Sequence, residues 1–541
     1  MVNSRNYPIG EQSFVKLREN DAIYVDKTQF IVPLIEKAFH PYYFLSRPRR
    51  FGKSLFVNTL EQVFLGNKQL FEGLYIYDKI QWDAYPVIRL SMDKIGFYEG
   101  GLEKALYEML KSIAKEHNIT LDNSLYSTQF GELIKKMSQK YQKKVVLLVD
   151  EYDKPIITYI EKEETTQAET NRNILKSFYG VLKDSSDHLR FLFITGVSKF
   201  SKVSIFSDLN HLDDLTLDTN FATICGFTEI ELRHYCHTGL EDLAFKNQMV
   251  VNEVVEKIRF WYNGFSWNAK EFVYNPYSTM LLMQKQVFNN YWFQSGTPTF
   301  LVKLINQAGE YDFSDLEVNE SVYNWHDLKN LDYVSIMLQT GYLTFKEHIF
   351  EQIYRVGYPN KEVEQSFSEM LLENHLHKHT GRMAVTVYDI EKAFKRHDIP
   401  RVLEIIADMF KSLPSQFFKE AKIVTDAQGM TKETHTPVGE NFYHAVIYLV
   451  FKILGISMPV EVSTQKGRID ALVETDTHIY VFEFKKNRKA TIALEQIKEN
   501  KYAEHFALSK KSIYLIGVAF NFQKRGISDS VIELYEGNKG N

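Results

Sequence analysis

The segment FLSRPRRFGKSLF, residues 44–56, holds the residues best suited to bind a phosphate group. Gly52, Lys53 and Ser54 match the end of the phosphate-binding loop G-x-x-x-x-G-K-[ST]. In that loop the backbone N–H groups and the lysine hold the phosphates, and the hydroxyl binds Mg²⁺. Arg47 stands where the first glycine should be, so the motif predicts a nucleotide site only if that position needs no positive φ.

Two acids further along the chain supply the second half of such a site. VVLLVDE, residues 145–151, is an apolar run that ends in Asp150 and Glu151. At the end of a buried strand, Asp150 is expected to hold Mg²⁺ and Glu151 to polarise the attacking water. Arg49 and Arg50 add positive charge, which predicts either phosphate contact or a solvated basic turn. The two halves together predict a site for Mg²⁺ and ATP.

A second group of charged residues lies near the end of the chain, in GRIDALVETDTHIYVFEFKKN, residues 467–487. Glu483 and Lys485 are two residues apart on an apolar strand and should project from the same face. A hairpin partner would bring Asp470 beside them, and Glu440 at the start of the preceding helix would add a ligand. Carboxylates bind Mg²⁺ or Mn²⁺, and a lysine beside them suits phosphodiester hydrolysis. The competing interpretation is a surface hairpin with a Glu–Lys pair.

These residues require an α/β protein that places them at strand ends. Alternating apolar strands and helices over residues 20–215 predict a parallel sheet with helices on both faces. We expect strands at 42–45, 87–90, 145–149 and 191–196, and helices from about 53 and at 101–117, 128–141 and 172–184. A smaller α/β unit follows, with helices expected at 440–454 and 491–506 and strands at 478–484 and 512–520.

The chain as a whole is expected to have four parts. The predicted order is an ATPase core, a helical lid or winged-helix-like region, a helical connector and a nuclease-like domain, at 1–215, 216–345, 346–430 and 431–541. The last boundary is placed in the polar stretch 426–437, and about 360–430 is expected to be mainly helical.

Composition excludes several classes of protein. The 64 Lys and Arg residues against 69 Asp and Glu give a net charge of −5, so nucleic-acid binding needs a local basic surface. Basic residues gather near the chain end, which predicts either contact with phosphate groups or a solvated face. They are Lys485, Lys486, Arg488, Lys489, Lys498 and Lys501. Two cysteines are too few for a disulfide framework. The polar N-terminus and the short apolar stretch at 442–456 predict a cytoplasmic protein without a membrane span.

Several motifs together resemble the AAA-ATPase-like family, whose members often end in a PD-(D/E)XK nuclease-like domain. The matching segments are YPIGEQSF (7–14), YVDKTQFI (24–31), FLSRPRRFGKSL (44–55), LLVDEYDKP (147–155), FITGVSKFSKVSIFSDLN (193–210), WYNGFSW (261–267), VYNPYS (273–278) and YWFQSGTPTFL (291–301). The match runs over nearly the whole chain. Arginine at the first loop position is usual in this family, which favours a real nucleotide site.

The resemblance carries further implications for individual residues. It implies that Tyr24–Lys27 lies near the nucleotide base and that Thr195 or Ser198 acts as a sensor for the γ-phosphate. It implies a restriction-endonuclease-like fold at the chain end, with Glu461 as a less certain addition and Gln496 as an auxiliary residue. The active set that it implies there is Glu440, Asp470, Glu483 and Lys485.

The favoured function is an ATP-dependent nuclease that cuts DNA, or less readily RNA, with Mg²⁺. The alternative is a nucleotide-controlled switch or scaffold that binds nucleic acid or protein and cuts nothing. ATP-driven translocation in DNA repair ranks last, because no helicase motifs are present. Two histidine-containing groups, Cys225 to His237 and His375 to His379, fit metal binding less well than ordinary structural roles. The oligomeric state stays open.

Overall fold

A computed structural model describes most of the chain. The described residues are 7–37, 41–199, 205–206, 209, 211–292, 299–308, 312–323, 331–376, 380–411, 419–425, 431–437, 446–447, 449–450, 462–464, 467–475, 477–506, 509–521 and 526–535. The chain divides into two compact units. The first comprises Met1–Leu304 with Phe313–Val363, and the second comprises Ile305–Asp312 with Glu364–Asn541.

The first unit is built on a parallel sheet of five strands in the order β2-β3-β4-β1-β5. The strands are β1 (Tyr42–Ser46), β2 (Val87–Ser91), β3 (Val145–Asp150), β4 (Leu189–Gly196) and β5 (Asp213–Asp214). Every residue of β1 and β3 is buried, as expected for a sheet covered on both faces. The predicted parallel α/β fold is confirmed, and β4 lies between β1 and β3.

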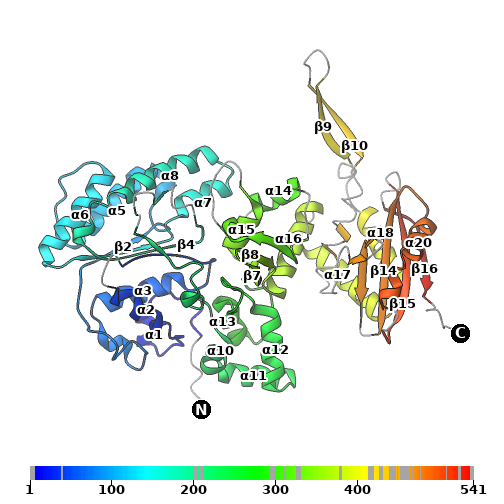
Figure 1. Cartoon of the computed structure of the whole chain (residues 1–541), viewed down its shortest axis with the longest axis horizontal. Coiled ribbons are helices and arrows are strands. Elements are labelled where there is room, and N and C mark those ends of the chain that lie inside the picture. The colour runs from blue at the N-terminus through cyan, green and yellow to red at the C-terminus, as the bar shows by residue number, and fades with distance from the viewer. Residues whose placement is uncertain are drawn as a thin grey trace. The chain divides into compact units, whose positions relative to one another are not determined.

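Helices cover both faces of this sheet (Figure 1). On one side are α1 (Phe14–Glu19), α2 (Ile31–Glu36) and α3 (Lys53–Phe64). On the other side are α5 (Leu102–Glu116), α6 (Tyr126–Tyr141), α7 (Lys154–Glu161) and α8 (Thr165–Gly180). The apolar residues of α5 repeat at helical spacing, and Leu102, Leu106 and Leu110 are buried. The short α4 (Phe97–Gly100) precedes α5.

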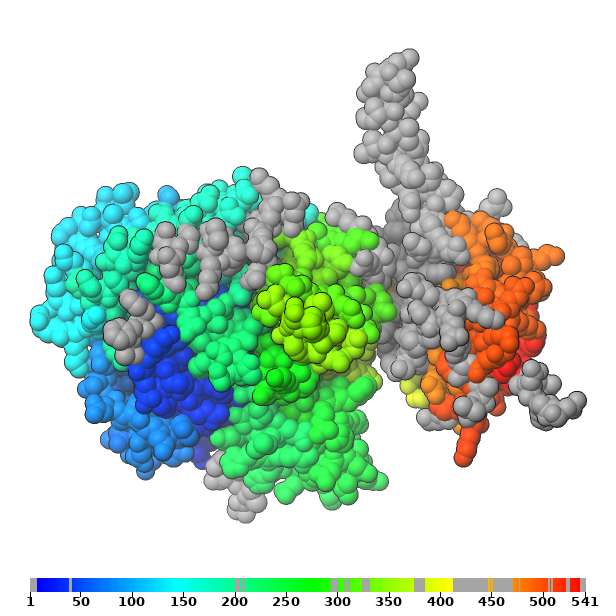
Figure 2. All heavy atoms as spheres, viewed as in Figure 1, coloured from blue at the N-terminus to red at the C-terminus, as the bar shows by residue number. Residues whose placement is uncertain are grey.

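Further helices complete the first unit. They are α10 (Glu229–Tyr235), α11 (His237–Asn247), α12 (Val251–Tyr262), α13 (Pro276–Lys285), α14 (Thr299–Ala308), which ends in the second unit, and α15 (Tyr333–Thr340). A small antiparallel sheet, β6-β8-β7, is formed by Leu316–Asn319, Ile353–Gly357 and Thr344–Phe350. The space-filling view shows the blue, cyan and green segments of this unit closely packed on the visible face (Figure 2). The region predicted to be helical therefore also contains strands.

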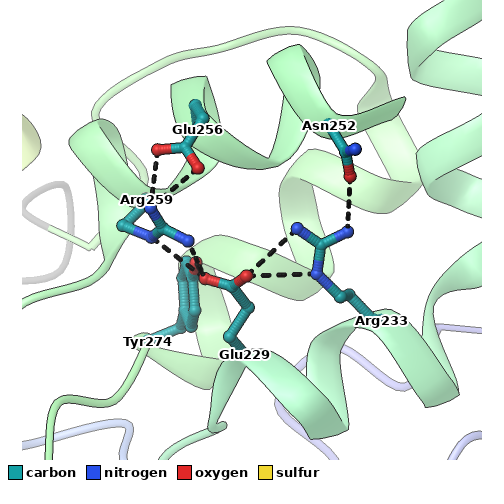
Figure 3. A network of polar contacts seen from close by, with 6 residues as sticks. All are labelled: Glu229, Arg233, Asn252, Glu256, Arg259 and Tyr274. Carbon is teal, nitrogen blue, oxygen red and sulfur yellow. Dashed lines mark hydrogen bonds and ion pairs between the residues drawn. The ribbon is translucent and has the colours of Figure 1, made fainter. Parts of the chain in front are cut away.

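A polar network joins α10 to α12 (Figure 3). Glu229 accepts hydrogen bonds from Arg233 and Arg259, and Tyr274 donates to the same carboxylate at 3.4 Å. The far ends of the two guanidinium groups contact Asn252 and Glu256 of α12. The shared carboxylate thus fixes one end of α10 against α12, at a partly exposed place where each ion pair contributes little.

The second unit contains a mixed sheet in the order β13-β14-β15-β16. These strands are Ala471–Glu474, His478–Lys486, Ser512–Asn521 and Gly526–Leu534. Strands β14 and β15 are parallel, and both edge pairs are antiparallel. Helix α20 (Ala490–Glu499) approaches β15 so closely that a Cβ at Gly517 would lie 2.3 Å from the carbonyl oxygen of Ala490. Only glycine fits there.

Other elements of the second unit differ from the expectation in part. Helices α16 (Lys361–Leu376, which begins in the first unit), α17 (Thr380–Lys395) and α18 (Ile399–Lys411) agree with the predicted helical connector. The prediction that about 360–430 is mainly helical agrees with these three helices, and it missed β9 (Lys419–Thr425), which forms an antiparallel hairpin with β10 (Thr431–Pro437). Its ladder satisfies the backbone of a polar stretch that lacks strand-like apolar alternation. Short pairs at β11 (Val462–Thr464) and β12 (Gly467–Ile469) precede β13.

No helix in the described part of the chain is long and apolar enough to cross a membrane.

Candidate nucleotide and carboxylate sites

The phosphate-loop motif lies between β1 and α3, in the strand–loop–helix context that it needs. Strand β1 ends at Ser46, and α3 begins at Lys53. Gly52 caps α3 with φ 93°, a left-handed conformation that favours glycine. The Lys53 ammonium is buried and donates to the carbonyl oxygen of Pro48 at 2.9 Å, closing the loop on itself. Burial lowers the pKa of Lys53, while the charges of Glu151 and Asp150 oppose that change.

The two acids stand at the end of β3, as the sequence predicts. Asp150 is buried and accepts a hydrogen bond from the Ser54 side chain. Its Oδ1 atom is buried without a hydrogen-bond partner among the described residues. Burial raises the pKa of Asp150 and of Glu151, against the positive charge of Lys53. A buried carboxylate oxygen without a partner beside a serine hydroxyl suits a hard cation such as Mg²⁺.

A cavity of about 470 Å³ opens beside this loop. Its polar wall contains the loop from Arg49 to Ser54 and the carboxylates of Glu151 and Asp153. Its apolar wall contains Ile9, Val25, Phe227, Tyr277 and Met280. A polar end with a phosphate loop and an apolar end with aromatic rings suit a phosphorylated ligand that carries a flat ring.

Arg47 does not line this cavity. Its side chain is fully buried and donates to the carbonyl oxygens of Ser46 and Thr216, each at 2.8 Å. Its guanidinium lies 4.0 Å from the ring centre of Trp267, and its charge is held by cation–π contact and carbonyl dipoles. The prediction that Arg47 contacts a nucleotide has no support from these contacts and stays a prediction. Arg47 instead anchors the start of the loop to the part of the chain around Trp267.

The other two loop arginines line the cavity in different settings. Arg49 forms a partly exposed ion pair with Glu161 at 2.8 Å. Arg50 has φ 67°, and its guanidinium lies 3.7 Å from the centre of the Tyr277 ring. Both therefore stay candidates for phosphate contact.

Thr195 and Ser198 lie close to the loop but inside the packed core. Thr195 is fully buried and donates to the carbonyl oxygen of Leu45 at 2.8 Å, which joins β4 to β1. In this structure the Thr195 hydroxyl thus joins two strands, and its role as a sensor stays a prediction. The backbone N–H of Ser198 donates to Asp153 at 2.6 Å, and the Ser198 side chain is also buried.

Asp153 is a site residue that the sequence reasoning missed. It is buried, lines the cavity and also accepts from the backbone N–H of Val197. A Cβ at Gly196 would lie 2.5 Å from its Oδ1 atom, so this close approach requires glycine. The motif VDEYD contains a third acid, which was the available signal. Asp153 fixes the segment after β4 against the end of β3.

The segment Tyr24–Lys27 contributes to the cavity wall, where the family resemblance places the base. Tyr24, Val25 and Lys27 all line the cavity. Lys27 is committed elsewhere, because it pairs with Glu231 at 2.7 Å and donates to the carbonyl oxygen of Thr223. This buried pair ties the segment to α10.

The outer side of the loop is held by residues far away in the sequence. Phe51 packs edge-on against Phe265 and Trp267, with ring centres 4.8 and 5.6 Å apart. The Trp292 indole donates to the carbonyl oxygen of Arg49 at 3.2 Å. A Cβ at Gly341 would lie 2.9 Å from the Pro48 ring. The loop is therefore enclosed by residues 265–341.

Glu362, at the start of α16, supports this enclosure. Its carboxylate is fully buried and accepts from the backbone N–H of Trp292 at 2.7 Å and from the Ser278 hydroxyl at 2.8 Å. Burial raises the pKa of Glu362 from 4.5 to about 7, although these hydrogen bonds act in the opposite direction. Sequence reasoning did not single out this residue, because nothing near it in the chain predicts its burial.

In the second unit, the predicted acids meet on β14. The backbone N–H of Phe484 donates to Asp470 Oδ2 at 2.8 Å, and β13 pairs with β14 in the register that brings Asp470 there. Lys485 contacts Glu483 Oε1 at 2.8 Å. The pair therefore lies on one strand face, as predicted, and by alternation this is the face of Ile479 and Val481, which pack with α20.

Glu483 is the buried member of this group. Its Oε2 atom has no hydrogen-bond partner among the described residues. Burial and the neighbouring Asp470 carboxylate raise the pKa of Glu483 to about 7, against the hydrogen bond from Lys485. A buried, partnerless carboxylate oxygen next to a second carboxylate fits a divalent cation. No group of three or more metal-binding side chains occurs in the described ranges.

Some predicted residues cannot be placed. Glu440 and Glu461 lie outside the described residues. Gln496 is half-buried on α20. Of the basic residues near the chain end, Lys498 and Lys501 form exposed ion pairs with Glu533 and Glu504. Cys225 and Cys236 are buried free thiols in the first unit.

Comparisons with known proteins agree with this architecture. Residues 8–206 match a family model described as "Predicted AAA-ATPase", and residues 438–530 match one described as "PD-(D/E)XK nuclease superfamily". A protein of Azotobacter chroococcum mcd 1, named "Uncharacterized protein in vnfD 5'region", is 36% identical over 98% of this chain and 99% of its own length.

The first matched segment contains β1 to β4 of the parallel sheet, and the second contains Asp470 and most of the mixed sheet with Glu483. This architecture is that of an ATPase joined to a nuclease-like domain. The chain belongs to the AAA-ATPase-like family, with a domain of the PD-(D/E)XK nuclease superfamily following its ATPase-like domain.

Proposed function

We propose that this chain hydrolyses ATP in the cavity of the first unit and that ATP controls the hydrolysis of phosphodiester bonds, in DNA, by the second unit. One observation carries the ATPase part. Lys53, Ser54 and Glu151, from two separate chain segments, line one cavity, and Ser54 contacts the buried Asp150. A chance Gly-Lys-Ser on a basic surface would have no acids behind it.

Each residue of the first site has a proposed role. The loop N–H groups and Lys53 bind the phosphates, with Lys53 leaving its contact with Pro48 to do so. Ser54 and Asp150 would hold Mg²⁺, whose charge would neutralise the phosphates. Glu151 orients and deprotonates the attacking water, for which its raised pKa is suitable. Arg49 and Arg50 lie on the same wall and are the arginines from which a phosphate contact is proposed to come.

The second site has a simpler composition. Asp470 and Glu483 would hold Mg²⁺ or Mn²⁺, and the ion would supply Lewis-acid activation of a phosphodiester. Glu440 is a further proposed ligand. Lys485 contacts Glu483 in this structure and is proposed to stabilise the negative charge that develops on the phosphate. The half-buried Gln496 on α20 is proposed as an auxiliary residue.

The deciding experiment measures cleavage of linear, circular and single-stranded DNA and of RNA by the full chain. It is run with Mg²⁺ or Mn²⁺, with and without ATP, beside the Asp470→Ala protein. We expect DNA cleavage that depends on ATP and is lost in the variant. Cleavage at the same rate with and without ATP would refute control of the second unit by ATP. Equal cleavage by the Asp470→Ala protein would refute the assignment of Asp470 to the cleavage site.

A nucleotide-controlled switch is the second candidate. The observation that favours it is the Glu483–Lys485 ion pair, which occupies one carboxylate oxygen of the second site. It predicts ATP hydrolysis with no cleavage of any substrate in the panel, together with ATP-dependent binding of DNA. Under either candidate we propose a cytoplasmic protein, because both cysteines are free thiols.

A further inference from the structure

The three arginines of the phosphate loop differ in what surrounds their charge. Arg47 is buried and held by carbonyl oxygens and Trp267. Arg49 is paired with a carboxylate, Glu161. Arg50 contacts neither kind of partner in the described part of the chain, and its Nη1 atom is buried without a hydrogen bond. Its partner is the face of Tyr277, at 3.7 Å.

The kind of contact determines what remains available on the guanidinium. Stacking on an aromatic face uses the flat side of the group and leaves its N–H edge free for an anion. A carboxylate partner, by contrast, occupies N–H groups and cancels the charge. Arg50 is thus the loop arginine whose charge and donors are both available. A buried donor without a partner is costly, which indicates that an acceptor completes it in another state. Arg47 Nε is also buried without a partner, but Arg47 does not line the cavity, whereas Arg50 does.

The loop backbone supports this position of Arg50. Its φ of 67° is uncommon for a residue with a side chain, and such a conformation persists only where the surroundings hold it. The next residue, Phe51, is buried between Phe265 and Trp267. Fixing Phe51 there fixes the turn that carries Arg50 on the cavity wall.

Tyr277 is also fixed by its neighbours. It lies in the first turn of α13, which Asn275 caps by accepting the backbone N–H of Ser278 at 3.0 Å. Ser278 in turn donates to the buried Glu362. The ring of Tyr277 lies on the cavity wall beside Met280. The start of α13 therefore offers a rigid surface on which the guanidinium can rest.

We infer that Arg50 is the arginine that binds the nucleotide's polyphosphate directly, and that Tyr277 is the residue that positions it. This inference rests on the proposed function, because it requires that the cavity bind ATP. It gives the three arginines different roles. Arg47 anchors the loop, Arg49 is a surface charge paired with Glu161, and Arg50 contacts the ligand. It also gives α13, from outside the matched ATPase segment of residues 8–206, a part in recognising the nucleotide.

The test is equilibrium titration of the full chain with Mg·ATP and, by competition, with adenosine, which lacks phosphates. The variants are Arg50→Ala, Tyr277→Ala and Tyr277→Phe, with Arg401→Ala as a matched control at an exposed ion pair of the second unit. Arg50→Ala should weaken ATP binding roughly 10- to 100-fold, the range for a lost charge-assisted hydrogen bond. Adenosine affinity should not change.

The tyrosine variants distinguish positioning from direct contact. Tyr277→Ala should weaken ATP binding by roughly three- to tenfold, and Tyr277→Phe should restore it, because the ring face and not the hydroxyl supports Arg50. The deficit of Arg50→Ala should shrink as salt screens the contact. Loss of adenosine affinity in Tyr277→Ala equal to the loss of ATP affinity would overturn the positioning role.

Two further outcomes keep the inference separate from the proposed function. ATP binding by Arg50→Ala at the level of Arg401→Ala would overturn the role of Arg50 while leaving the ATP site intact. Absence of ATP binding by the unaltered chain would overturn the proposed function and this inference with it. Thermal unfolding of every variant without nucleotide checks that each one is folded.

Discussion

The two carboxylate sites of this protein differ in what surrounds the acids. In the first unit, Glu151 lines a cavity together with Lys53 and two arginines, and the buried Asp150 contacts Ser54 of the same wall. In the second unit, Asp470 and Glu483 have one close cation, Lys485. Each site nevertheless keeps one buried carboxylate oxygen without a partner, at Asp150 Oδ1 and at Glu483 Oε2.

This difference in charge suggests two modes of binding. The first site suits a phosphate anion that brings its own Mg²⁺, whereas the second site suits a metal ion that binds before the phosphodiester. The lysine and arginines beside the acids of the first site suit a polyphosphate that arrives together with Mg²⁺. The pair of carboxylates around Glu483 has too little positive charge to attract a phosphodiester unaided. Under the proposed function, a metal ion at the second site would reverse this local charge.

The largest effect should come from Glu483→Gln, which removes one of the two described carboxylates of the second site and keeps the shape of the side chain. We expect cleavage to fall about 10³-fold, because a divalent cation loses one of its two described carboxylates. ATP turnover by the same protein should stay at the level of the unaltered chain. Gel assays of cleavage and phosphate-release assays measure the two activities. A fall in ATP turnover equal to that in cleavage would show that the sites are not separable.

Glu362 offers a third buried carboxylate, one with no role in binding a cation. Its folded-state pKa is raised from 4.5 to about 7, so the folded protein binds its proton more tightly than the unfolded chain. Its stabilising effect is fully present below pH 4.5 and is lost as the pH rises to 7. The change should amount to about 3 kcal/mol of unfolding free energy.

The measurement is denaturant unfolding of the unaltered chain and of Glu362→Gln at pH 5 and pH 8. The glutamine cannot ionise, so the difference between the two proteins should shift in favour of the variant as the pH rises. A difference that stays constant with pH would contradict the raised pKa.

Lys53→Ala should weaken ATP binding about 100-fold and leave the fold intact. The lysine is the cation closest to the acids of the first site, and its loss leaves their repulsion toward phosphate uncompensated. Lys485→Ala serves as the matched control in the second site and should leave ATP affinity unchanged. Nucleotide titration of both proteins checks the prediction, and tight ATP binding by Lys53→Ala would refute the phosphate-loop assignment.

The smallest effect, on the free energy of unfolding, is expected in the polar network of Figure 3. There the Glu229 carboxylate has hydrogen-bond partners besides Arg259. Arg259→Ala removes two partly exposed ion pairs, with Glu229 and with Glu256. Such pairs contribute little in water, so we expect a loss below about 1 kcal/mol in the unfolding free energy. Urea unfolding measures it. A loss of several kcal/mol would show that the network is more than a surface contact.

Local sequence signals predicted the elements that carry each site. The apolar strand before Arg47, the Gly-Lys-Ser at the helix start and the two acids after β3 all occur where their patterns place them. The two-residue spacing of Glu483 and Lys485 likewise predicted a shared strand face. These features depend on residues close together in the chain.

Two of the features that were missed depend on distant residues. Nothing near Arg47 shows that Trp267 covers it, and that contact makes Arg47 an anchor of the loop. The burial of Glu362 arises from Ser278 and Trp292, about 70 to 84 positions earlier. The β9–β10 hairpin, which pairs neighbouring segments, was also missed, because the sequence there is polar. For Arg47 and Glu362, tertiary contact, which no local pattern encodes, decided the outcome.

The contacts around Glu362 form a closed chain of connections. Hydrogen bonds link Arg49 to Trp292 and Trp292 to Glu362, and another links Glu362 to Ser278. Tyr277, the chain neighbour of Ser278, contacts Arg50, which follows Arg49 in the chain. A movement of the loop therefore either breaks this ring or pulls on the first turn of α16. That helix has 16 residues and is about 24 Å long, with a rise of about 1.5 Å per residue. A tilt of the first turn of α16 displaces the later turns of the same helix by a larger distance. The residues of α16 from Glu364 onward belong to the second unit, which also contains Asp470 and Glu483.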